Sequence, residues 1–207
     1  MRKKGKIPER TIIRFPLYLS ILRELEKKGI ETVSSRIIAQ RAKIKASQFR
    51  KDISYFGEFG KQGLGYSVIH LIERITAILY LTRPQQAVLV GAGNLGTALC
   101  NFPGFPGWNF EIVRVYDKDP RKVGRRSGKV EVEDVNKLPV DLGIPLGIIT
   151  VPANAAQKVA DLLVKSGIKG ILNFSGARLI TPPEVIVRDV DLTHELAILN
   201  YYCCVKS

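Results

Sequence analysis

Residues 87–99 read AVLVGAGNLGTAL, a short apolar run that leads into a loop with three glycines. Gly91, Gly93 and Gly96 follow the apolar residues with the spacing G-x-G-x-x-G. This pattern predicts a strand, a tight turn and the start of a helix. The first glycine permits the turn, the second lets the backbone approach a pyrophosphate, and the third allows close packing of the helix. The stretch therefore predicts an α/β fold that binds a dinucleotide.

A second predicted strand supplies a carboxylate where such a fold binds a ribose. The segment FEIVRVYDKDP places Asp117 at the end of this strand, about 20 residues after the glycine loop. A carboxylate there accepts hydrogen bonds from the ribose hydroxyls and repels a 2′-phosphate, so NAD(H) is favoured over NADP(H). Lys118 and Arg121 follow closely and leave the phosphorylated cofactor open.

The later part of the chain alternates strand and helix patterns. Apolar strands are predicted at 145–153, 169–175 and 184–190, with an amphipathic helix at 154–167. This order predicts a doubly wound parallel sheet that binds its ligand at the carboxyl ends of the strands. Tight turns without a ligand role are the alternative for the later strand ends. The predicted cofactor-binding residues are Gly91, Ala92, Gly93, Asn94, Leu95, Gly96, Asp117, Lys118, Thr150, Val151, Pro152, Asn173, Phe174 and Ser175.

The chain of 207 residues is basic, and its charge is unevenly distributed. Residues 1–80 contain 17 Lys and Arg residues against 7 Asp and Glu residues, so they carry +10 of the formal net charge of +13. A basic segment joined to a nearly neutral one indicates that the first part binds a polyanion such as nucleic acid. A solvated basic face that only aids solubility is the alternative.

Composition and motifs also argue against several other classes of protein. A hydrophobic content of 45% is ordinary for a globular protein and argues against disorder. No apolar run reaches the roughly 18 residues of a transmembrane helix, and the N-terminus lacks a secretory cleavage site, so we expect a cytoplasmic protein. Cys100, Cys203 and Cys204 lack metal-ligand spacing, so no metal site is predicted. A redox role of the adjacent pair stays open.

Three helices are predicted at the start of the basic part, before the glycine-rich segment. The segment RTIIRFPLYLSILRELEKKG has apolar residues at helical spacing and ends near Gly29. Ser34 or Ser35 is expected to cap a second helix, and Ser47 a third. Two short helices joined by a tight turn are typical of a helix-turn-helix, whose last helix enters the major groove of DNA. A surface helix of an ordinary bundle is the alternative.

The third predicted helix is rich in side chains that bind bases and phosphates. Arg50 can pair bidentately with guanine, whereas lysines suit phosphates. The glycine-rich segment GEFGKQGLGY that follows predicts a hairpin, or wing, with Lys61 near its tip. The predicted DNA-binding residues are Arg10, Ser34, Ser35, Lys43, Lys45, Ser47, Gln48, Arg50, Lys51, Tyr55 and Lys61.

The end of the chain carries an apolar stripe with little domain left to cover it. Leu192, Leu196, Leu199 and Tyr202 lie on one face of a predicted helix, which we expect to pack on a second copy of the chain. The predicted domains are a winged helix-turn-helix DNA-binding domain at 1–82, a Rossmann NAD(H)-binding domain at 83–190 and a dimerisation helix at 191–207.

The combined motifs resemble those of the Rex family of redox-sensing transcriptional repressors. They include RFPLY, FRKDISYFGEFGKQGLGY, VGAGNLGTAL, YDKDPRKVG and GIKGILNFS, and they extend over nearly the whole chain. The resemblance implies a homodimer with a winged helix-turn-helix, a Rossmann domain that binds NAD(H), and a C-terminal helix exchanged between subunits. It also implies binding to pseudo-palindromic operator DNA, release when NADH rises, and no enzymatic activity.

Two features depart from the family's usual pattern. Members often have a tyrosine ahead of PGF, where this chain has Phe102, and the resemblance places this side chain near the nicotinamide. The resemblance also implies an interdomain switch in which Asp191 pairs with Arg14, here without the tyrosine hydroxyl. The segment NFSGA replaces the commoner NFAP. Both departures concern the switch and leave the glycine loop intact.

Two other functions are alternatives to a redox-sensing repressor. A DNA-binding regulator that senses coenzyme A or another nucleotide would use a related fold. An NAD-dependent dehydrogenase would need a substrate lobe and a proton-transfer group near the nicotinamide. The two histidines, His70 and His194, lie in predicted helices outside the nucleotide fold, and no second lobe fits. The redox-sensing repressor is therefore favoured over both alternatives.

Overall fold

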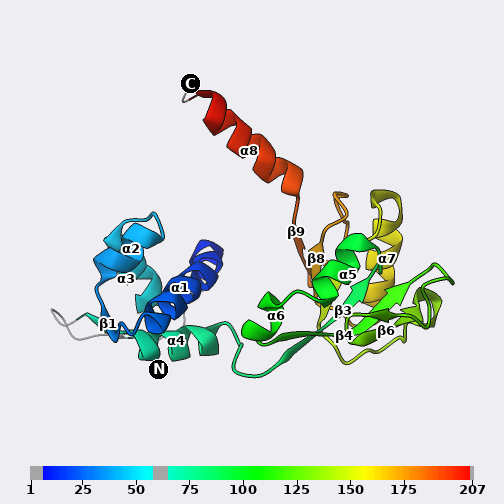
Figure 1. The fold of residues 1–207 in the computed structure, drawn as a ribbon, viewed down its shortest axis with the longest axis horizontal. Helices are drawn as coiled ribbons and strands as arrows, with labels where there is room; N and C mark the ends of the chain where they lie inside the picture. The colour runs from blue at the N-terminus through cyan, green and yellow to red at the C-terminus, as the bar shows by residue number, and fades with distance from the viewer. Residues whose placement is uncertain (1–6, 58–64, 206–207) are drawn as a thin grey trace. The chain divides into compact units, whose positions relative to one another are not determined.

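The computed structural model describes residues 7–57 and 65–205, and the chain divides into two compact units, residues 1–83 and 84–207. Figure 1 shows the elements of both units in chain order from blue to red. Each unit has its own buried side chains, so the two are described separately.

The first unit consists of helices and a short sheet. Aromatic and aliphatic side chains fill its core, and Phe15, Tyr18 and Phe49 are fully buried. The ring of Tyr18 packs edge-on against Phe49, with their centroids 5.1 Å apart. Its elements are α1 (Glu9–Lys27), β1 (Thr32–Val33), α2 (Ser35–Arg41), α3 (Ala46–Ser54), β2 (Tyr66–Ser67) and α4 (Val68–Ile78), and β1 pairs antiparallel with β2.

The helix ends mostly follow the predicted signals. Gly29 adopts a positive φ of 71° just after α1, and the Ser34 hydroxyl caps α2 by accepting a hydrogen bond from the Ile37 amide. The predicted cap by Ser47 is wrong, because Lys45 takes the extended N-cap conformation and α3 begins at Ala46. Most of the predicted wing, including Lys61, lies outside the described residues.

The second unit is built around a seven-stranded sheet with the order β5-β6-β4-β3-β7-β8-β9. All neighbouring pairs are parallel except the edge pair of β5 and β6. The order reverses between β3 and β7, which is the switch point of a doubly wound sheet and confirms the predicted fold. The strands are β3 (Gln85–Val90), β4 (Phe110–Asp117), β5 (Arg126–Ser127), β6 (Val130–Asp134), β7 (Leu146–Ile149), β8 (Gly170–Asn173) and β9 (Ile186–Asp189).

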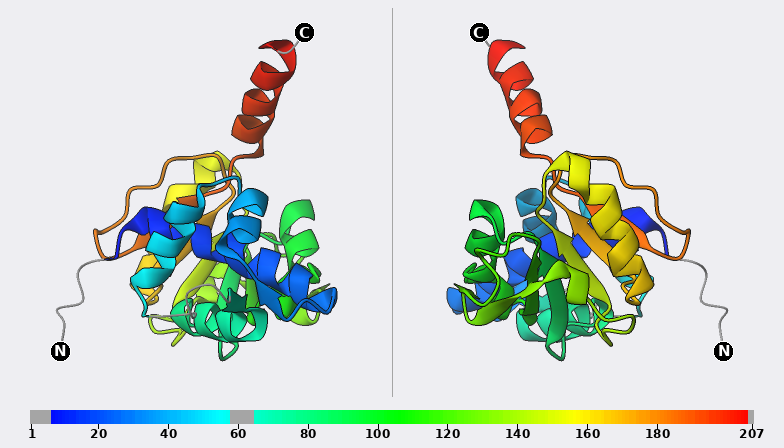
Figure 2. Two further views of the ribbon diagram at one scale, coloured as in Figure 1. Left: turned by 90° about the vertical axis from the view of Figure 1, so that its left-hand side faces the viewer. Right: turned by 90° about the vertical axis from the view of Figure 1, so that its right-hand side faces the viewer.

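Helices cover the two faces of this sheet unequally. α7 (Ala153–Lys165) packs its buried residues against one face, and α5 (Asn94–Cys100) contributes Leu99 and Cys100 to a smaller apolar cluster. The short elements α6 (Gly104–Gly107) and η1 (Val135–Lys137) lie in connecting segments. α8 (Leu192–Val205) has no buried residue, and Figure 2 shows it extending away from the sheet. No helix in the described ranges is long and apolar enough to span a membrane.

Candidate functional site

The glycine loop has a different steric reason for each of its three glycines. Gly91 has a φ of +111°, and a Cβ there would lie 2.8 Å from the carbonyl carbon of Thr150. A Cβ on Gly96 would overlap the carbonyl oxygen of Gly91. A Cβ on Gly93 would meet no protein atom within 4 Å. The first and third glycines are therefore needed by the fold itself, whereas Gly93 leaves open space beside the backbone.

Thr150 fastens this loop to the neighbouring strand. It directly follows β7, and its hydroxyl donates to the carbonyl oxygen of Gly91 at 2.8 Å. The Thr150 amide also donates to the carbonyl of Val90 at 2.9 Å. Ligands of doubly wound sheets bind outside the carboxyl ends of the strands at this switch point. The glycine loop and Thr150 thus lie together at the expected position of a nucleotide.

Asp117 ends β4 and lies almost fully buried beside the glycine loop. Its carboxylate accepts hydrogen bonds from the Ala92 amide at 2.8 Å, the Asp119 amide at 2.9 Å and the Lys122 ammonium at 2.9 Å. Burial raises the pKa of Asp117, but these hydrogen bonds outweigh it and hold the pKa below its usual value. Asp117 is therefore ionised at neutral pH and presents a fixed acceptor.

A cavity of about 810 Å³ connects these features. It brings together nine of the predicted cofactor-binding residues: Gly91, Gly93, Asp117, Lys118, Thr150, Val151, Pro152, Phe174 and Ser175. Ala92, Asn94, Leu95, Gly96, Phe102 and Asn173 are absent from its lining. The volume is within the range of nucleotide and cofactor sites.

Several side chains of the cavity were missed by the sequence reasoning. Lys122, Asn154 and Lys158 are three polar examples. The two lysines are the most relevant to a nucleotide, because lysine ammonium groups bind phosphate oxygens. Lys122 follows Asp117 by five residues, and Lys158 lies one helical turn after Asn154 on α7. These spacings are the signals that could have pointed to them. Among the described residues, no group of three or more His, Cys, Asp or Glu side chains could hold a metal ion.

A second polar site surrounds the ends of β8 and β9. Asn173 is buried, and its amide nitrogen donates to Asp189 and to the carbonyl oxygen of Ala177, both at 2.7 Å. Asp191 accepts hydrogen bonds from the amide and hydroxyl of Thr193 at the start of α8. Thus Asn173 organises the loop after β8, while the bonding of Asp191 within this unit is local.

In the first unit, a buried carboxylate joins α1 to α3. Asp52 has no exposed surface and accepts hydrogen bonds from Nε and Nη2 of Arg14 at 2.6 and 2.7 Å. It also accepts from Tyr18 at 2.7 Å, Gln48 at 2.8 Å and Thr11 at 3.1 Å. Burial raises the pKa of Asp52, but the bonds from Arg14, Tyr18 and Gln48 outweigh it, so the pKa is lowered. This network links α1 to α3 through one buried carboxylate.

Most of the predicted DNA-binding side chains in the described ranges lie on α2, on α3 or in the turn between them, whereas Arg10 lies on α1. Arg50 donates to the Ser35 hydroxyl at 3.1 Å, so these two candidates lie side by side. Lys43 adopts a positive φ of 53° in the turn. Gln48 differs from the expectation of a fully outward side chain, because it is half-buried and donates to Asp52. Arg10, Lys45, Ser47, Lys51 and Tyr55 are exposed, and Ser34 serves as the cap of α2.

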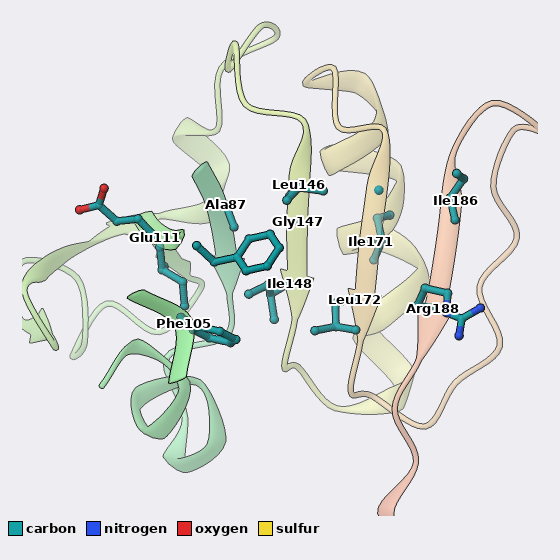
Figure 3. A pocket seen from close by; sticks show the side chains of 13 residues that line it. Ala87, Phe105, Glu111, Leu146, Gly147, Ile148, Ile171, Leu172, Ile186 and Arg188 are labelled. Atoms are coloured by element: carbon teal, nitrogen blue, oxygen red, sulfur yellow. The ribbon is translucent and has the colours of Figure 1, made fainter. Parts of the chain in front are cut away.

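The second unit also has an uncovered apolar surface. A cavity of about 370 Å³ lies against β4, β3, β7, β8 and β9, and its lining is almost entirely apolar. Figure 3 shows Ile148 and Leu172 on this face, Phe105 at one end, and a helix behind the strands. Exposed apolar residues also occupy α8: Leu192, Leu196, Ile198, Leu199, Tyr201, Tyr202 and Val205. Within the second unit, the sheet therefore has an apolar cavity and α8 has a row of exposed apolar side chains.

Family models match both units of the chain. Residues 6–54 match the model described as "Putative DNA-binding protein N-terminus", and residues 82–177 match the "CoA binding domain". These matches agree with a helical DNA-binding unit followed by a Rossmann-like sheet.

Curated relatives match the full length. The chain is 45% identical over 208 residues to the "Redox-sensing transcriptional repressor Rex" of Desulforamulus reducens, covering 99% of both chains. It is 48% identical over 202 residues to the protein of the same name from Carboxydothermus hydrogenoformans, covering 96% of this chain and 97% of that protein.

Solved structures give the same result. The crystal structure of RSP in complex with β-NAD⁺ and operator DNA has a TM-score of 0.90 and 36% identity, covering 98% of this chain and 94% of that one. The structure of RSP with β-NADH has a TM-score of 0.87 and 33% identity, covering 98% and 97%. With a shared fold and 45% identity to a named relative along both chains, this chain belongs to the Rex family of redox-sensing transcriptional repressors.

Proposed function

We propose that this protein is a dimeric, non-enzymatic repressor that binds operator DNA in the cytoplasm and is released from it by NADH. The observation that carries the proposal is that one chain combines a candidate DNA-binding site with a candidate nucleotide site. A basic helix-turn-helix precedes a cavity lined by Gly91, Gly93 and the buried carboxylate of Asp117. Full-length similarity to named redox-sensing repressors supports the combination.

On the DNA side, α3 is the helix that enters the major groove. Arg50 reads a guanine, while Lys43, Lys45 and Lys51 bind phosphates and set the register. The contact of Arg50 with the Ser35 hydroxyl supports this role, because it holds the guanidinium on the exposed surface shared by α2 and α3. Gln48 has less freedom to read bases, since one of its amide protons is used by Asp52.

On the nucleotide side, the pyrophosphate lies over the glycine loop and the adenosine ribose at Asp117. The open space beside Gly93 and the ionised state of Asp117 support this placement. Thr150 to Pro152 and Asn173 to Ser175 follow the neighbouring strands β7 and β8. The nicotinamide is placed toward Phe102, whose ring packs edge-on against Phe105 at 5.1 Å.

Charge explains why NADH rather than NAD⁺ would release the DNA. The reduced nicotinamide ring is neutral, whereas the oxidised ring carries a positive charge that is costly to place in apolar surroundings. A ligand shifts a conformational equilibrium only by its differential affinity for the two states, and the coupling is reciprocal. Operator DNA must therefore weaken NADH binding by the same factor by which NADH weakens DNA binding.

Arg14 and Asp191 are proposed to report the occupancy of the nicotinamide site to the DNA-binding unit. In the structure, Arg14 bonds to Asp52 through Nε and Nη2, and the bonds of Asp191 go to Thr193 and His194. Breaking the Arg14–Asp52 pair would leave the buried carboxylate of Asp52 without its cation. We therefore expect Arg14 to keep this pair and to bond Asp191 through its remaining nitrogen, Nη1.

Titration of a labelled operator complex tests the proposed function. At fixed salt, NADH is expected to release the protein at a concentration at least about tenfold below that of NAD⁺, a difference of about 1.4 kcal/mol in binding. Fluorescence anisotropy measures the release, and random DNA of equal length gives the background. Equal potency of the two nucleotides, or no release by either, would rule out redox sensing.

A regulator that senses coenzyme A is the second candidate. The match of residues 82–177 to the model of a CoA binding domain favours it, as do the lysines Lys118, Lys122 and Lys158 around the cavity. Calorimetry with CoA, NADH and NAD⁺ on the same preparation separates the two, because a CoA sensor must bind CoA more tightly than either dinucleotide.

The exposed apolar residues of α8 support the proposed dimer. Removal of residues 192–207 is expected to convert a species of twice the 23.0 kDa chain mass into monomer or aggregate. The reason is that the exposed apolar stripe of α8 is proposed to pack on the second copy, which shields the stripe from water. Light scattering after size exclusion measures the mass. Full-length variants provide matched controls: Leu196→Ser with Leu199→Ser should act like the deletion, and Thr193→Ala with Asn200→Ala should not. A truncated protein that stays a soluble dimer would disprove this role of α8.

A further inference from the structure

Three basic residues follow β4, and the structure gives them different environments. Arg121 donates to the Asp119 carboxylate at 3.0 and 2.9 Å and does not line the nucleotide cavity. Lys118 lines the cavity. Lys122 also lines it, and its Nζ lies 2.9 Å from Oδ2 of Asp117. Lys122 is therefore the basic residue of this segment that directly contacts the carboxylate assigned to the ribose.

The backbone holds Lys122 in this position. The Asp119 carboxylate accepts a hydrogen bond from the Arg121 amide at 3.0 Å, and the Asp119 carbonyl accepts from the Lys122 amide at 2.9 Å. Beyond the turn, Gly124 has a φ of +81° and donates to Val132 on β6 at 2.9 Å. The segment is thus anchored at both ends, so the approach of Lys122 to Asp117 is built into the loop.

Hydrogen-bond capacity at Asp117 limits how a ribose can bind. A carboxylate offers about four acceptor positions. Oδ2 already accepts from the Ala92 amide and from Lys122, and Oδ1 accepts from the Asp119 amide. One position on Oδ1 is left for a ribose hydroxyl. The neighbouring hydroxyl needs another partner, and the Lys122 ammonium has two protons besides the one that it gives to Asp117.

We propose that Lys122 acts with Asp117 as a donor–acceptor pair on the adenosine ribose, and that Lys122 determines how strongly a 2′-phosphate is tolerated. This inference rests on the proposed binding of NADH. The positive charge of Lys122 offsets the repulsion between Asp117 and a 2′-phosphate. When the carboxylate is removed, the same ammonium becomes a ligand for that phosphate.

A double-mutant cycle tests this specificity role. NADH and NADPH are titrated by calorimetry against the wild type, Asp117→Asn, Lys122→Met and the double variant. Asp117→Asn is expected to bind NADPH about tenfold more tightly than the wild type, since the lysine is freed for the phosphate. The double variant should lose that gain. Lys122→Met alone should weaken NADH severalfold and lower the NADPH-to-NADH affinity ratio further.

Two further variants distinguish specificity from general charge and from folding. Arg121→Met removes an adjacent positive charge that is paired with Asp119, and it should leave the affinity ratio unchanged. Lys122→Arg keeps a cationic donor and should retain most of the NADH affinity, which separates loss of the donor from misfolding.

Failure of this inference and failure of the proposed function give different results. If the double variant keeps the NADPH gain of Asp117→Asn, or if Lys122→Met leaves the affinity ratio unchanged, Lys122 has no specificity role although NADH still binds. If the wild type binds neither dinucleotide, the proposed function and this inference both fail.

Discussion

Replacing Arg14 with methionine is expected to lower the free energy of unfolding by about 3 kcal/mol, the lower end of the range for breaking a buried ion pair. Asp52 has no exposed surface and would lose its cationic partner, whereas methionine keeps most of the apolar packing. The lower end applies because the Arg14 side chain is 23% exposed. Urea denaturation of the full chain, followed by circular dichroism, measures the loss.

Arg41→Met is the matched control for this prediction. Arg41 also pairs with a carboxylate, at 3.1 Å, but its partner Glu24 is 53% exposed. Exposed pairs contribute about 0–1 kcal/mol, so this variant should be nearly neutral. Equal losses in Arg14→Met and Arg41→Met would show that Asp52 does not depend on Arg14.

The Arg14→Met effect should also depend on pH in a defined direction. Because the pKa of Asp52 is lowered in the fold, its ionised form stabilises the protein above the unfolded pKa of about 3.9. This contribution is lost as the pH falls through the folded pKa. The difference between wild type and Arg14→Met should therefore shrink in acid.

Valine at Gly96 is expected to reduce the stability of the fold, whereas valine at Gly93 is expected to reduce the affinity for NADH. A side chain at Gly96 would overlap the Gly91 carbonyl, so Gly96→Val should destabilise the fold by more than about 4 kcal/mol or prevent folding. A side chain at Gly93 meets no protein atom within 4 Å, so Gly93→Val should fold normally. It should nevertheless weaken NADH binding by more than about tenfold, because it occupies the space beside the pyrophosphate.

Thermal unfolding and calorimetry with NADH measure the two effects on the same preparations. Thr97→Val, on the same helix, offers a control for valine itself in α5. Unchanged NADH binding by a folded Gly93→Val would mean that the loop does not hold the nucleotide. A stable, folded Gly96→Val would contradict the close contact between α5 and the loop.

Much of the fold could be predicted because its signals are local. The apolar run before Gly91, the glycine spacing and the alternation of strands and helices each lie within short segments, so they predict the doubly wound sheet. The predicted cap at Ser47 was wrong, because the position of a helix end shifts by one or two residues with the backbone conformation. Here Lys45 takes the extended N-cap conformation, so Ser47 lies inside α3.

The sequence by itself determined the kind of protein, with a basic helical unit and a Rossmann-like sheet, and it predicted that the glycine loop at 91–96 and the carboxylate of Asp117 bind the nucleotide. Only the tertiary structure decided which charged groups meet. Arg14 and Asp52 are separated by 38 residues, yet the packing of α1 against α3 brings them to 2.6 Å. The return of Lys122 to Asp117 likewise depends on the turn after β4. The physical reason is that spacing along the chain fixes secondary structure, whereas ion pairs depend on where separate elements meet when their apolar faces are buried.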